Sequence, residues 1–235
     1  MTETVVHCQP AYILHQQQYR ESSLILDVMT RDLGRVSLIA KGVRKAKSKT
    51  LGILRPFVHL SLSFLGRSEL KTLTSAEMIG MPNELPGLAL YCGFYINELV
   101  SYFLHKDDPH PEVFEDYQAC LSALLLNQAN EVALRIFELN LLENIGYGIN
   151  LSDDLHHGMP ISANKGYRFH KEHGLIEDRE GPYSGRMLQA IAKRQFDNAE
   201  VLIVAKQLMR TAIDSHLQGK QLKSRSVINT IVKRL

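Results

Sequence analysis

The chain has few cysteines and no long run of apolar residues, and both shortages narrow the kinds of protein it can be. Its 235 residues include three cysteines, Cys8, Cys92 and Cys120, which are odd in number, widely spaced and set among apolar neighbours. A disulfide framework or a thiolate metal site is therefore not indicated, and we expect all three to be reduced core residues. No stretch approaches eighteen consecutive apolar residues, and the first residues, MTETVVHCQP, show neither the basic nor the apolar region of a signal peptide. We therefore expect a cytoplasmic protein.

Charge is unevenly distributed along the chain, although the net charge is only +2. Residues 1–80 hold 11 Lys and Arg against 6 Asp and Glu, residues 81–152 hold 2 against 10, and residues 153–235 hold 14 against 9. Two basic segments thus flank an acidic one, a pattern that favours a polyanion meeting both ends of the chain. Chance segregation of solvated charge is the alternative, and the charge pattern alone does not separate the two.

The first third alternates apolar and polar residues with the period of a half-buried β-sheet. The alternation is clear around Leu26, Leu38 and Leu62, and turn signals at Gly34 and Gly66 separate the runs. With a first strand at residues 11–15 and a fifth at 70–73, five short strands fit within residues 1–80. The sequence therefore predicts a five-stranded OB-type β-barrel, a fold whose open face commonly binds nucleic acid.

The break between the third and fourth predicted strands holds the densest positive charge. Residues 41–55 read KGVRKAKSKTLGILR and contain no Asp or Glu. We expect a mobile cationic loop that contacts phosphate groups, because ammonium and guanidinium groups release counterions from nucleic acid without reading its bases. An ordinary solvated loop is the alternative. The candidate DNA-binding residues of the barrel are Arg35, Lys41, Arg44, Lys45, Lys47, Lys49, Arg55 and Lys71. The aromatic residues Tyr12, Tyr19, Phe57 and Phe64 fit a core equally well, so none is assigned to base stacking.

Beyond Gly80 the apolar residues recur with helical spacing, which predicts three helices in residues 81–149. A polar stretch at residues 150–183 follows, with a hairpin that turns at Gly174, and three further helices occupy residues 184–235. We therefore expect an α+β multi-domain protein: the barrel, an α-helical bundle formed by residues 81–149 and 184–235, and an inserted hairpin region at 150–183. In the last helix Lys223 and Arg225 either lengthen a DNA track or complement helix ends.

Six segments resemble, in this order, the RecO DNA repair family of enteric and related bacteria. They are RESSLILDVMTRDLGRVSLIAKGVRK, LRPFVHLSL, SELKTLTSAE, LYCGFYINEL, ALRIFELNLLENIGYG and GKQLKSR. The single motifs are weak, but their order and spacing are specific, and together they cover nearly the whole chain. The chain departs from the family in residues 150–182, where many members carry a four-cysteine zinc site and this chain has no cysteine.

The histidines of that region do not form an evident replacement for the zinc site. His170 and His173 stand three apart, and positions three apart on a strand point to opposite faces. His156 and His157 are adjacent, which is awkward for one ion. We therefore expect no metal ion and no other cofactor, and surface histidines near a hairpin.

The resemblance implies a non-enzymatic recombination mediator. RecO-like proteins bind single- and double-stranded DNA and anneal complementary strands, even when single-strand-binding protein (SSB) coats them. With RecR they help to load RecA onto the coated DNA. The resemblance thus implies DNA, SSB, RecR and RecA as partners, and a nucleoid-associated place in the cytoplasm.

In this family SSB is recruited through its acidic tail, which ends in phenylalanine. A receptor for such a tail needs an apolar pocket beside a cation that holds a carboxylate. Arg135 is the only Lys or Arg in residues 107–164. The candidate tail receptor therefore consists of Arg135, Leu134, Leu139 and Leu142. Ion pairs within the helix are the alternative, because Glu131 and Glu138 stand four before and three after Arg135.

Two other classes of protein compete with the mediator. A nuclease or other enzyme needs clustered carboxylates or a nucleophile with a base, and the acidic residues of the middle segment show no such motif. An OB-type RNA- or ribosome-binding protein shares the barrel and the basic loop, and only the helices and the resemblance argue against it.

Overall fold

A computed structural model describes residues 4–45, 48, 50–81, 84–126, 130–154 and 156–232. The chain divides into two compact units, Met1–Gln128 with Ser224–Leu235, and Ala129–Lys223. This division differs from the expected one, because the first two helices group with the barrel instead of with the other helices. In the part of the chain that the structure describes, no helix is long and apolar enough to cross a membrane.

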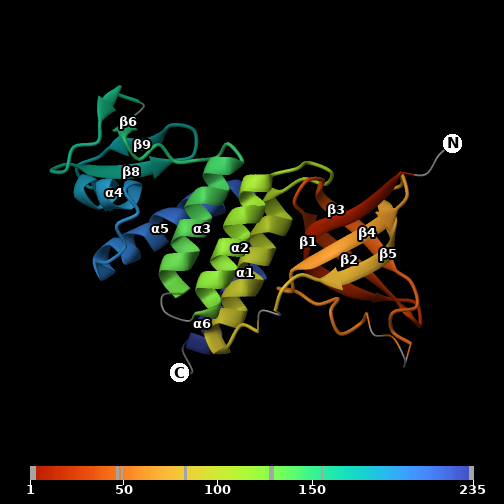
Figure 1. Cartoon of the computed structure of the whole chain (residues 1–235). Coiled ribbons are helices and arrows are strands. Elements are labelled where there is room, and N and C mark those ends of the chain that lie inside the picture. The colour runs from red at the N-terminus through yellow and green to blue at the C-terminus, as the bar shows by residue number, and fades with distance from the viewer. Residues whose placement is uncertain are drawn as a thin grey trace. The chain divides into compact units, whose positions relative to one another are not determined.

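Five strands close into the expected barrel (Figure 1). They are β1 (Val5–Tyr19), β2 (Ser23–Thr30), β3 (Gly34–Ala40), β4 (Leu60–Leu65) and β5 (Leu70–Met78). Around the barrel the order is β1-β2-β3-β5-β4, with β3 and β5 parallel and the other paired strands antiparallel. The prediction of an N-terminal five-stranded OB-type barrel followed by helices is confirmed.

Strand β1 is three times as long as the alternation in the sequence predicted. It pairs with β2 along its second half and with β4 along its first half, and its register shifts between Val6 and Gln9 and between Ile13 and His15. Such irregularities bend a strand, so one strand can serve both sides of a closed barrel. Cys8 lies at the first shift with φ of +51° and is exposed, so the prediction of a core residue is wrong for Cys8. Cys92 and Cys120 are buried as expected.

The barrel core is built from the inward-facing residues of the alternating strands. Its most deeply buried members include Leu26, Val28, Val36, Leu38, Leu60, Leu62 and Phe64. Val43 and Leu54, which belong to the long connection between β3 and β4, add their side chains to the same core. The tight turn from β2 into β3 requires glycine at position 34, where φ is +69° and a Cβ would lie 2.2 Å from the carbonyl oxygen of Asp108.

Two helices complete the body of the first unit. They are α1 (Gly87–Phe103) and α2 (Pro111–Leu125), and α1 packs against both α2 and β1. Asn97 of α1 donates through Nδ2 to the Leu14 carbonyl oxygen at 2.9 Å and accepts from the Tyr117 hydroxyl at 2.6 Å. These buried hydrogen bonds fix α1 and α2 to the barrel. Most of α6 (Lys223–Val232) belongs to the same unit, although it comes last in the chain.

The second unit combines three helices with small sheets. The helices are α3 (Asn130–Asn144), α4 (Gly185–Ala192) and α5 (Ala199–His216), and α5 packs against both α3 and α4. The strands are β6 (Asp153–Asp154), β7 (Met159–Pro160), β8 (Gly166–His170), β9 (Gly174–Glu177) and β10 (Tyr183–Ser184), of which β10, β8 and β9 form one sheet and β6 and β7 another. The hairpin expected to turn at Gly174 is therefore present.

Candidate nucleic-acid interface

The turn between β1 and β2 and the start of the β3–β4 connection lie together at one end of the barrel. The backbone N–H of Arg44 donates to the Ser22 carbonyl oxygen at 2.9 Å, and Arg44 Nη1 donates to the Arg20 carbonyl oxygen at 3.1 Å. Between the two segments is a shallow open hollow. It is lined by Tyr19, Arg20, Glu21, Ser22, Ser23, Ile39, Lys41, Gly42 and Lys45.

The connection after β3 is more ordered than the expected mobile loop, over the residues that are described. Val43 and Leu54 are buried in the barrel core. Turn hydrogen bonds join Lys45 N–H to the Gly42 carbonyl oxygen at 3.3 Å and Leu54 N–H to that of Thr50 at 3.3 Å. Apolar anchors thus hold residues 41–45 and 50–55 against the barrel. Two of the predicted DNA-binding residues, Lys47 and Lys49, lie outside the described residues.

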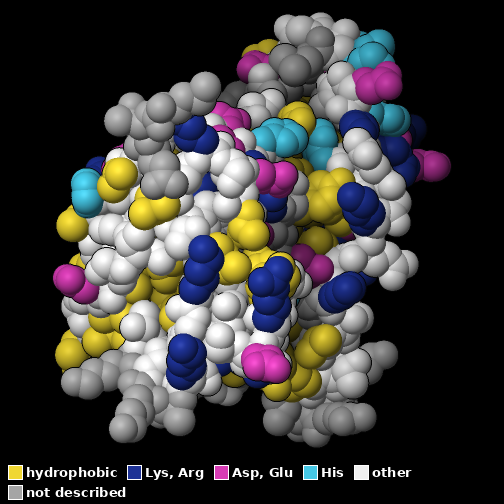
Figure 2. All heavy atoms as spheres, turned by 90° about the vertical axis from the view of Figure 1, so that its right-hand side faces the viewer, with side chains coloured by type: hydrophobic (Ala, Val, Ile, Leu, Met, Phe, Trp, Pro, Cys, Tyr) yellow, Lys and Arg dark blue, Asp and Glu magenta, His cyan; other side chains and the backbone are white. Residues whose placement is uncertain are grey.

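Lys41, Arg44 and Lys45 carry positive charge that no carboxylate of the described residues compensates by direct contact. Among the residues that the structure describes, none of these three forms an ion pair, although Glu21 also lines the hollow. On the barrel face turned to the viewer in Figure 2, several Lys and Arg side chains stand apart from one another among uncharged side chains. Cations of this kind can neutralise phosphates without first breaking an ion pair.

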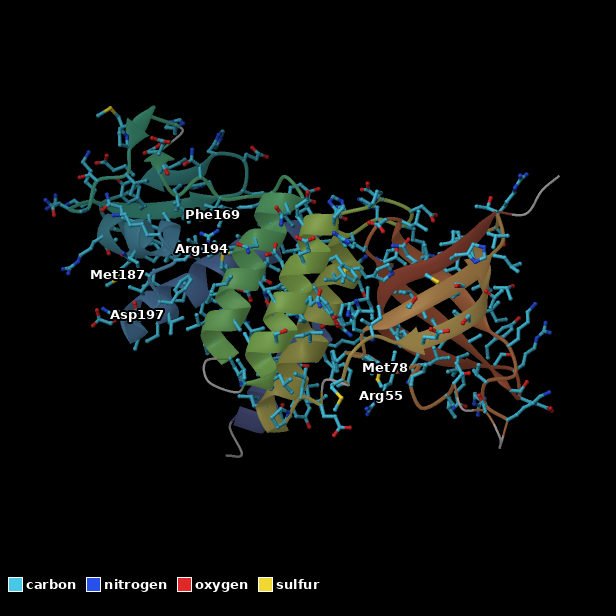
Figure 3. The ribbon with its side chains drawn as sticks, in the orientation of Figure 1. Arg55, Met78, Phe169, Met187, Arg194 and Asp197 are labelled. Atoms are coloured by element: carbon cyan, nitrogen blue, oxygen red, sulfur yellow. The ribbon has the colours of Figure 1, made fainter. Side chains whose placement is uncertain are left out.

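Two further candidates, Arg55 and Lys71, are already paired. Arg55, labelled in Figure 3, lies 3.2 Å from Glu84, and both side chains are exposed, so this pair contributes little and exchanges easily with other anions. Lys71 lies 2.9 Å from Asp107, and only 16% of the Lys71 side chain is exposed. Arg55 is therefore the more accessible of the two to a phosphate.

Arg35 has a role inside the first unit, and the structure does not support it as a phosphate contact. Its Nε lies 3.1 Å from Asp27 Oδ1, and its side chain is 15% exposed. Its Nη1 donates to the carbonyl oxygens of Leu104, at 2.8 Å, and of Ser101. These carbonyls lie at the C-terminal end of α1, where intrahelical donors are missing and a cation is favoured.

Lys223 and Arg225 lie in the first turn of α6, where the helix dipole favours anions, which argues against the alternative that they complement helix ends. Arg225 Nη2 donates to the Tyr95 hydroxyl at 3.3 Å, and its guanidinium carbon lies 5.6 Å from the centre of the Tyr95 ring. Arg225 thus docks α6 onto α1. Lys223 is exposed at the start of the helix, and its place in a DNA track stays a prediction.

The residues predicted to receive an SSB tail form part of a core instead of a surface pocket. Exposure is 6% for Leu134, 4% for Arg135, 2% for Leu139 and 1% for Leu142. Arg135 Nη2 donates to Glu138 Oε1 at 2.7 Å, which is the helical ion pair given above as the alternative. A guanidinium at this depth cannot meet a carboxylate of another protein without first breaking its buried ion pair with Glu138. Burial of all four residues therefore argues against a tail receptor at this place.

Sequence reasoning missed Tyr19 and Arg20 at the hollow. Of the four barrel aromatics considered above, Tyr12, Phe57 and Phe64 are buried, whereas Tyr19 is partly exposed at the barrel edge. The Arg20 guanidinium carbon lies 5.2 Å from the centre of the Tyr19 ring. The position of both residues next to a hairpin turn, after the exposed run of Gln16 to Gln18, was the available signal.

The histidine region is organised by a buried carboxylate. Asp154 accepts the backbone N–H groups of His156, His157 and Glu177 at 2.9, 3.1 and 2.7 Å, and its Oδ2 lies 2.8 Å from His157 Nδ1. Burial raises the pKa of Asp154, but the hydrogen bonds from His157 and Glu177 outweigh it and lower the pKa to about 2. His173 lies in the turn after β8, so the argument from strand faces does not apply to it. Over the described residues, no group of three His, Cys, Asp or Glu side chains is placed to hold a metal ion.

Comparison with known proteins identifies the family to which the chain belongs. Residues 3–82 match the family model for the recombination protein O N terminal region, and residues 87–226 match that for its C terminal region. The chain belongs to the RecO family. Over 230 residues it is 40% identical to the DNA repair protein RecO of Shigella flexneri and to the protein of that name from Escherichia coli, covering 96% of this chain and 95% of each relative. The expected RecO membership is confirmed, and the relatives are named for DNA repair and not for a catalytic activity.

Proposed function

We propose that this RecO family member is a non-enzymatic recombination mediator. It binds single- and double-stranded DNA and anneals complementary strands, and with RecR it promotes the loading of RecA onto SSB-coated single strands. The observation that carries the proposal is the anchored group Lys41, Arg44 and Lys45, which forms no ion pair within the described part of the chain. We call these three residues the barrel cations.

Annealing needs two conditions that a cationic surface meets without covalent chemistry. The repulsion between two phosphate backbones has to be screened, and the bases have to stay free to pair. The barrel cations, with Arg20 at the same hollow, offer phosphate contacts, which carry no sequence information. This favours DNA binding that is driven by charge and does not depend on the base sequence.

The partner proteins are inferred from the family, and no site on the barrel is assigned to them. We propose that SSB binds through its acidic tail and that RecR and RecA act with this chain, without assigning residues to these contacts. A nucleoid-associated place in the cytoplasm follows from the proposed DNA binding.

Annealing of SSB-coated complementary oligonucleotides by the purified protein, without nucleotide or metal ion, tests the proposed activity. We expect annealing with intact SSB and a marked loss with SSB that lacks its last residues. Tight DNA binding without annealing in either case would overturn the mediator role. Preference for structured RNA in the same assay would favour the RNA-binding alternative.

Replacing the barrel cations together, as Lys41→Ala, Arg44→Ala and Lys45→Ala, tests where DNA binds. Each lost phosphate contact on a single strand lowers the slope of log affinity against log salt concentration by about 0.7, so we expect a slope shallower by about 2. Affinity should fall equally for all oligonucleotide sequences. The matched control is Arg31→Ala, Lys165→Ala and Lys206→Ala, which removes the same charge from residues that are each in an exposed ion pair. Equal loss in both variants, or loss for some sequences only, would contradict the assignment.

A further inference from the structure

A partly exposed aromatic pair lies where α3 of the second unit ends. The ring of Tyr147 stacks on the ring of His216, with centroids 4.4 Å apart and planes 20° apart. Tyr147 is 48% exposed, although it carries one of the larger side chains of the unit. This aromatic pair belongs neither to the barrel surface nor to the hairpin region, and the proposed function has not used it.

The backbone around Tyr147 fixes where its ring lies. Gly146 has φ of +82°, and the Tyr147 N–H donates to the Leu142 carbonyl oxygen at 2.8 Å, which ends α3 in a left-handed cap. In such a cap the residue at position 147 commonly packs onto its own helix. Here the ring packs on His216, in the last turn of α5. A ring held by a cap on one side and a stack on the other loses little conformational entropy when something binds to it.

The charges around the aromatic pair favour an anion nearby. Lys171, in the turn between β8 and β9, is close enough to His216 to add to the lowering of the pKa of His216 that burial mainly causes. Lys220 follows His216 by four residues and lies beyond the end of α5. The two carboxylates nearest along the chain are both paired, Glu143 with Arg194 at 2.7 Å (Arg194 is labelled in Figure 3) and Asp214 with Arg210 at 3.8 Å. Glu172, beside Lys171, is the acidic residue of the turn.

We propose that Tyr147 and His216 form a stacking platform for an unpaired base of single-stranded DNA, with Lys171 and Lys220 contacting the flanking phosphates. This proposal rests on the proposed DNA-binding function and adds a second contact, within the second unit, that is separate from the barrel cations. Stacking on an aromatic ring tolerates any base because every base has a π-face. A duplex offers no such base, since its bases are already stacked on one another. The platform therefore distinguishes single strands from duplexes, which the barrel cations do not.

The absence of tryptophan from the chain allows a direct test. The variant Tyr147→Trp places the only tryptophan of the protein on the platform, where a stacked base quenches its fluorescence. We expect saturable quenching by an oligothymidylate, and little quenching by an oligonucleotide of the same length made of abasic sites or by a duplex. The control variant Tyr91→Trp places the tryptophan at a partly exposed position of α1, where no quenching is expected. Absence of quenching in Tyr147→Trp at DNA concentrations that saturate binding would overturn the platform.

Affinity measurements separate this proposal from the barrel site. Tyr147→Leu should weaken single-strand binding about ten-fold and leave duplex binding unchanged, while Tyr147→Phe keeps the ring and the affinity. If circular dichroism and urea unfolding show that Tyr147→Leu is not folded, the quenching of Tyr147→Trp alone tests the platform. Equal weakening for single strands and duplexes would overturn the platform. If the barrel-cation variant lost all DNA binding and annealing, and DNA did not quench the fluorescence of Tyr147→Trp, DNA binding would be located in the barrel alone.

Discussion

Arg35 lies between a carboxylate and the end of a helix, and its contacts predict a structural effect when it is replaced. Arg35→Ala removes the partner of Asp27 and the donors to the Ser101 and Leu104 carbonyl oxygens. Hydrogen bonds to charged groups contribute about 1.5–3 kcal/mol, so we expect the free energy of unfolding to fall by about 2–3 kcal/mol. Urea unfolding measures this loss. DNA affinity of the folded variant should stay near that of the unmodified protein.

Arg35→Lys provides the control for this prediction. Lysine keeps the positive charge, but its single ammonium group cannot reproduce the planar array of donors that reaches three acceptors. We expect most of the stability to be lost in Arg35→Lys as well. A variant with normal stability and weaker DNA binding would return Arg35 to the phosphate-binding residues.

His59 gives the first unit a dependence of stability on pH. Its ring stacks on Tyr12 with centroids 4.9 Å apart and planes 11° apart, and its buried Nε2 has no hydrogen-bond partner among the described residues. Burial lowers the pKa of His59 below its usual value of 6.5, because it removes water from the charged ring. The folded state therefore favours the neutral ring, and its stabilising contribution is complete above about pH 6.5 and is lost as the pH falls below that value.

A comparison of His59→Phe with the unmodified protein measures this effect. The urea midpoint of the unmodified protein should fall more between pH 7.5 and pH 5.5 than that of the variant. His216, whose pKa is also lowered, is present in both proteins and cancels in the comparison. Parallel pH dependence of the two midpoints would show that His59 does not titrate in this way.

Charge at single residues was predictable from the sequence only where neighbours in the chain decide exposure. The run around Arg44 and Lys45 has no acidic residue near it, and these side chains are at the surface. Arg35, on β3, was an equally plausible phosphate contact in the sequence. Its partners, however, lie eight residues away on β2 and more than sixty residues away at the end of α1. Arg135 looked isolated in the sequence, whereas folding buries it beside Glu138. Pairing and burial of this kind depend on the tertiary structure.

Strands and helices were predicted well where one hydrophobic period runs unbroken. The alternation along β2, β3 and β4 and the helical spacing of α1 and α2 identified these elements. Strand β1 exceeded its prediction because two register shifts interrupt the alternation and polar residues fill its second half. The β3–β4 connection was expected to be mobile because its charges dominate its composition. Val43 and Leu54, two apolar residues among the charges, decide its anchoring.

Asp154 of β6 accepts hydrogen bonds from the backbone of neighbouring segments, so its replacement should affect whole strands of the second unit. Asp154→Ala leaves the N–H groups of His156, His157 and Glu177 without their acceptor. We expect faster hydrogen exchange in residues 153–178 and unchanged exchange in the barrel. Because the pKa of Asp154 is lowered to about 2, its contribution is present above the usual Asp pKa, about 3.9, and is lost as the pH falls toward 2.

Asp154→Asn is the matched control, because it keeps the shape and one acceptor oxygen but removes the charge. Its hydrogen exchange should lie between those of Asp154→Ala and the unmodified protein. Exchange rates in residues 153–178 that do not change in either variant would rule out Asp154 as the organising residue of this region.

At the scale of the whole molecule, the two units do not follow the three charge segments of the sequence. The acidic residues 81–152 are divided between the first unit, which holds α1 and α2, and the second, which holds α3. The barrel cations and the proposed stacking platform therefore belong to different units, each built from a basic and an acidic part. The sequence indicated both basic segments, but the division of the acidic one depends on how the helices pack.

The chain leaves the first unit at residue 128 and returns to it at residue 224, and Glu98 makes the contact at the point of return. Its Oε2 accepts from the Ser224 N–H at 2.9 Å and from the Ser224 hydroxyl at 2.5 Å, which places an anion at the positive end of α6. Glu98→Ala should therefore lower the stability of the first unit by about 1–2 kcal/mol and raise hydrogen exchange in α6, while α5 keeps its protection. The control Glu84→Ala removes a carboxylate from an exposed ion pair and should cost under about 0.5 kcal/mol. If α5 and α6 lost protection together, α6 would behave as part of the second unit, and the chain would not return to the first.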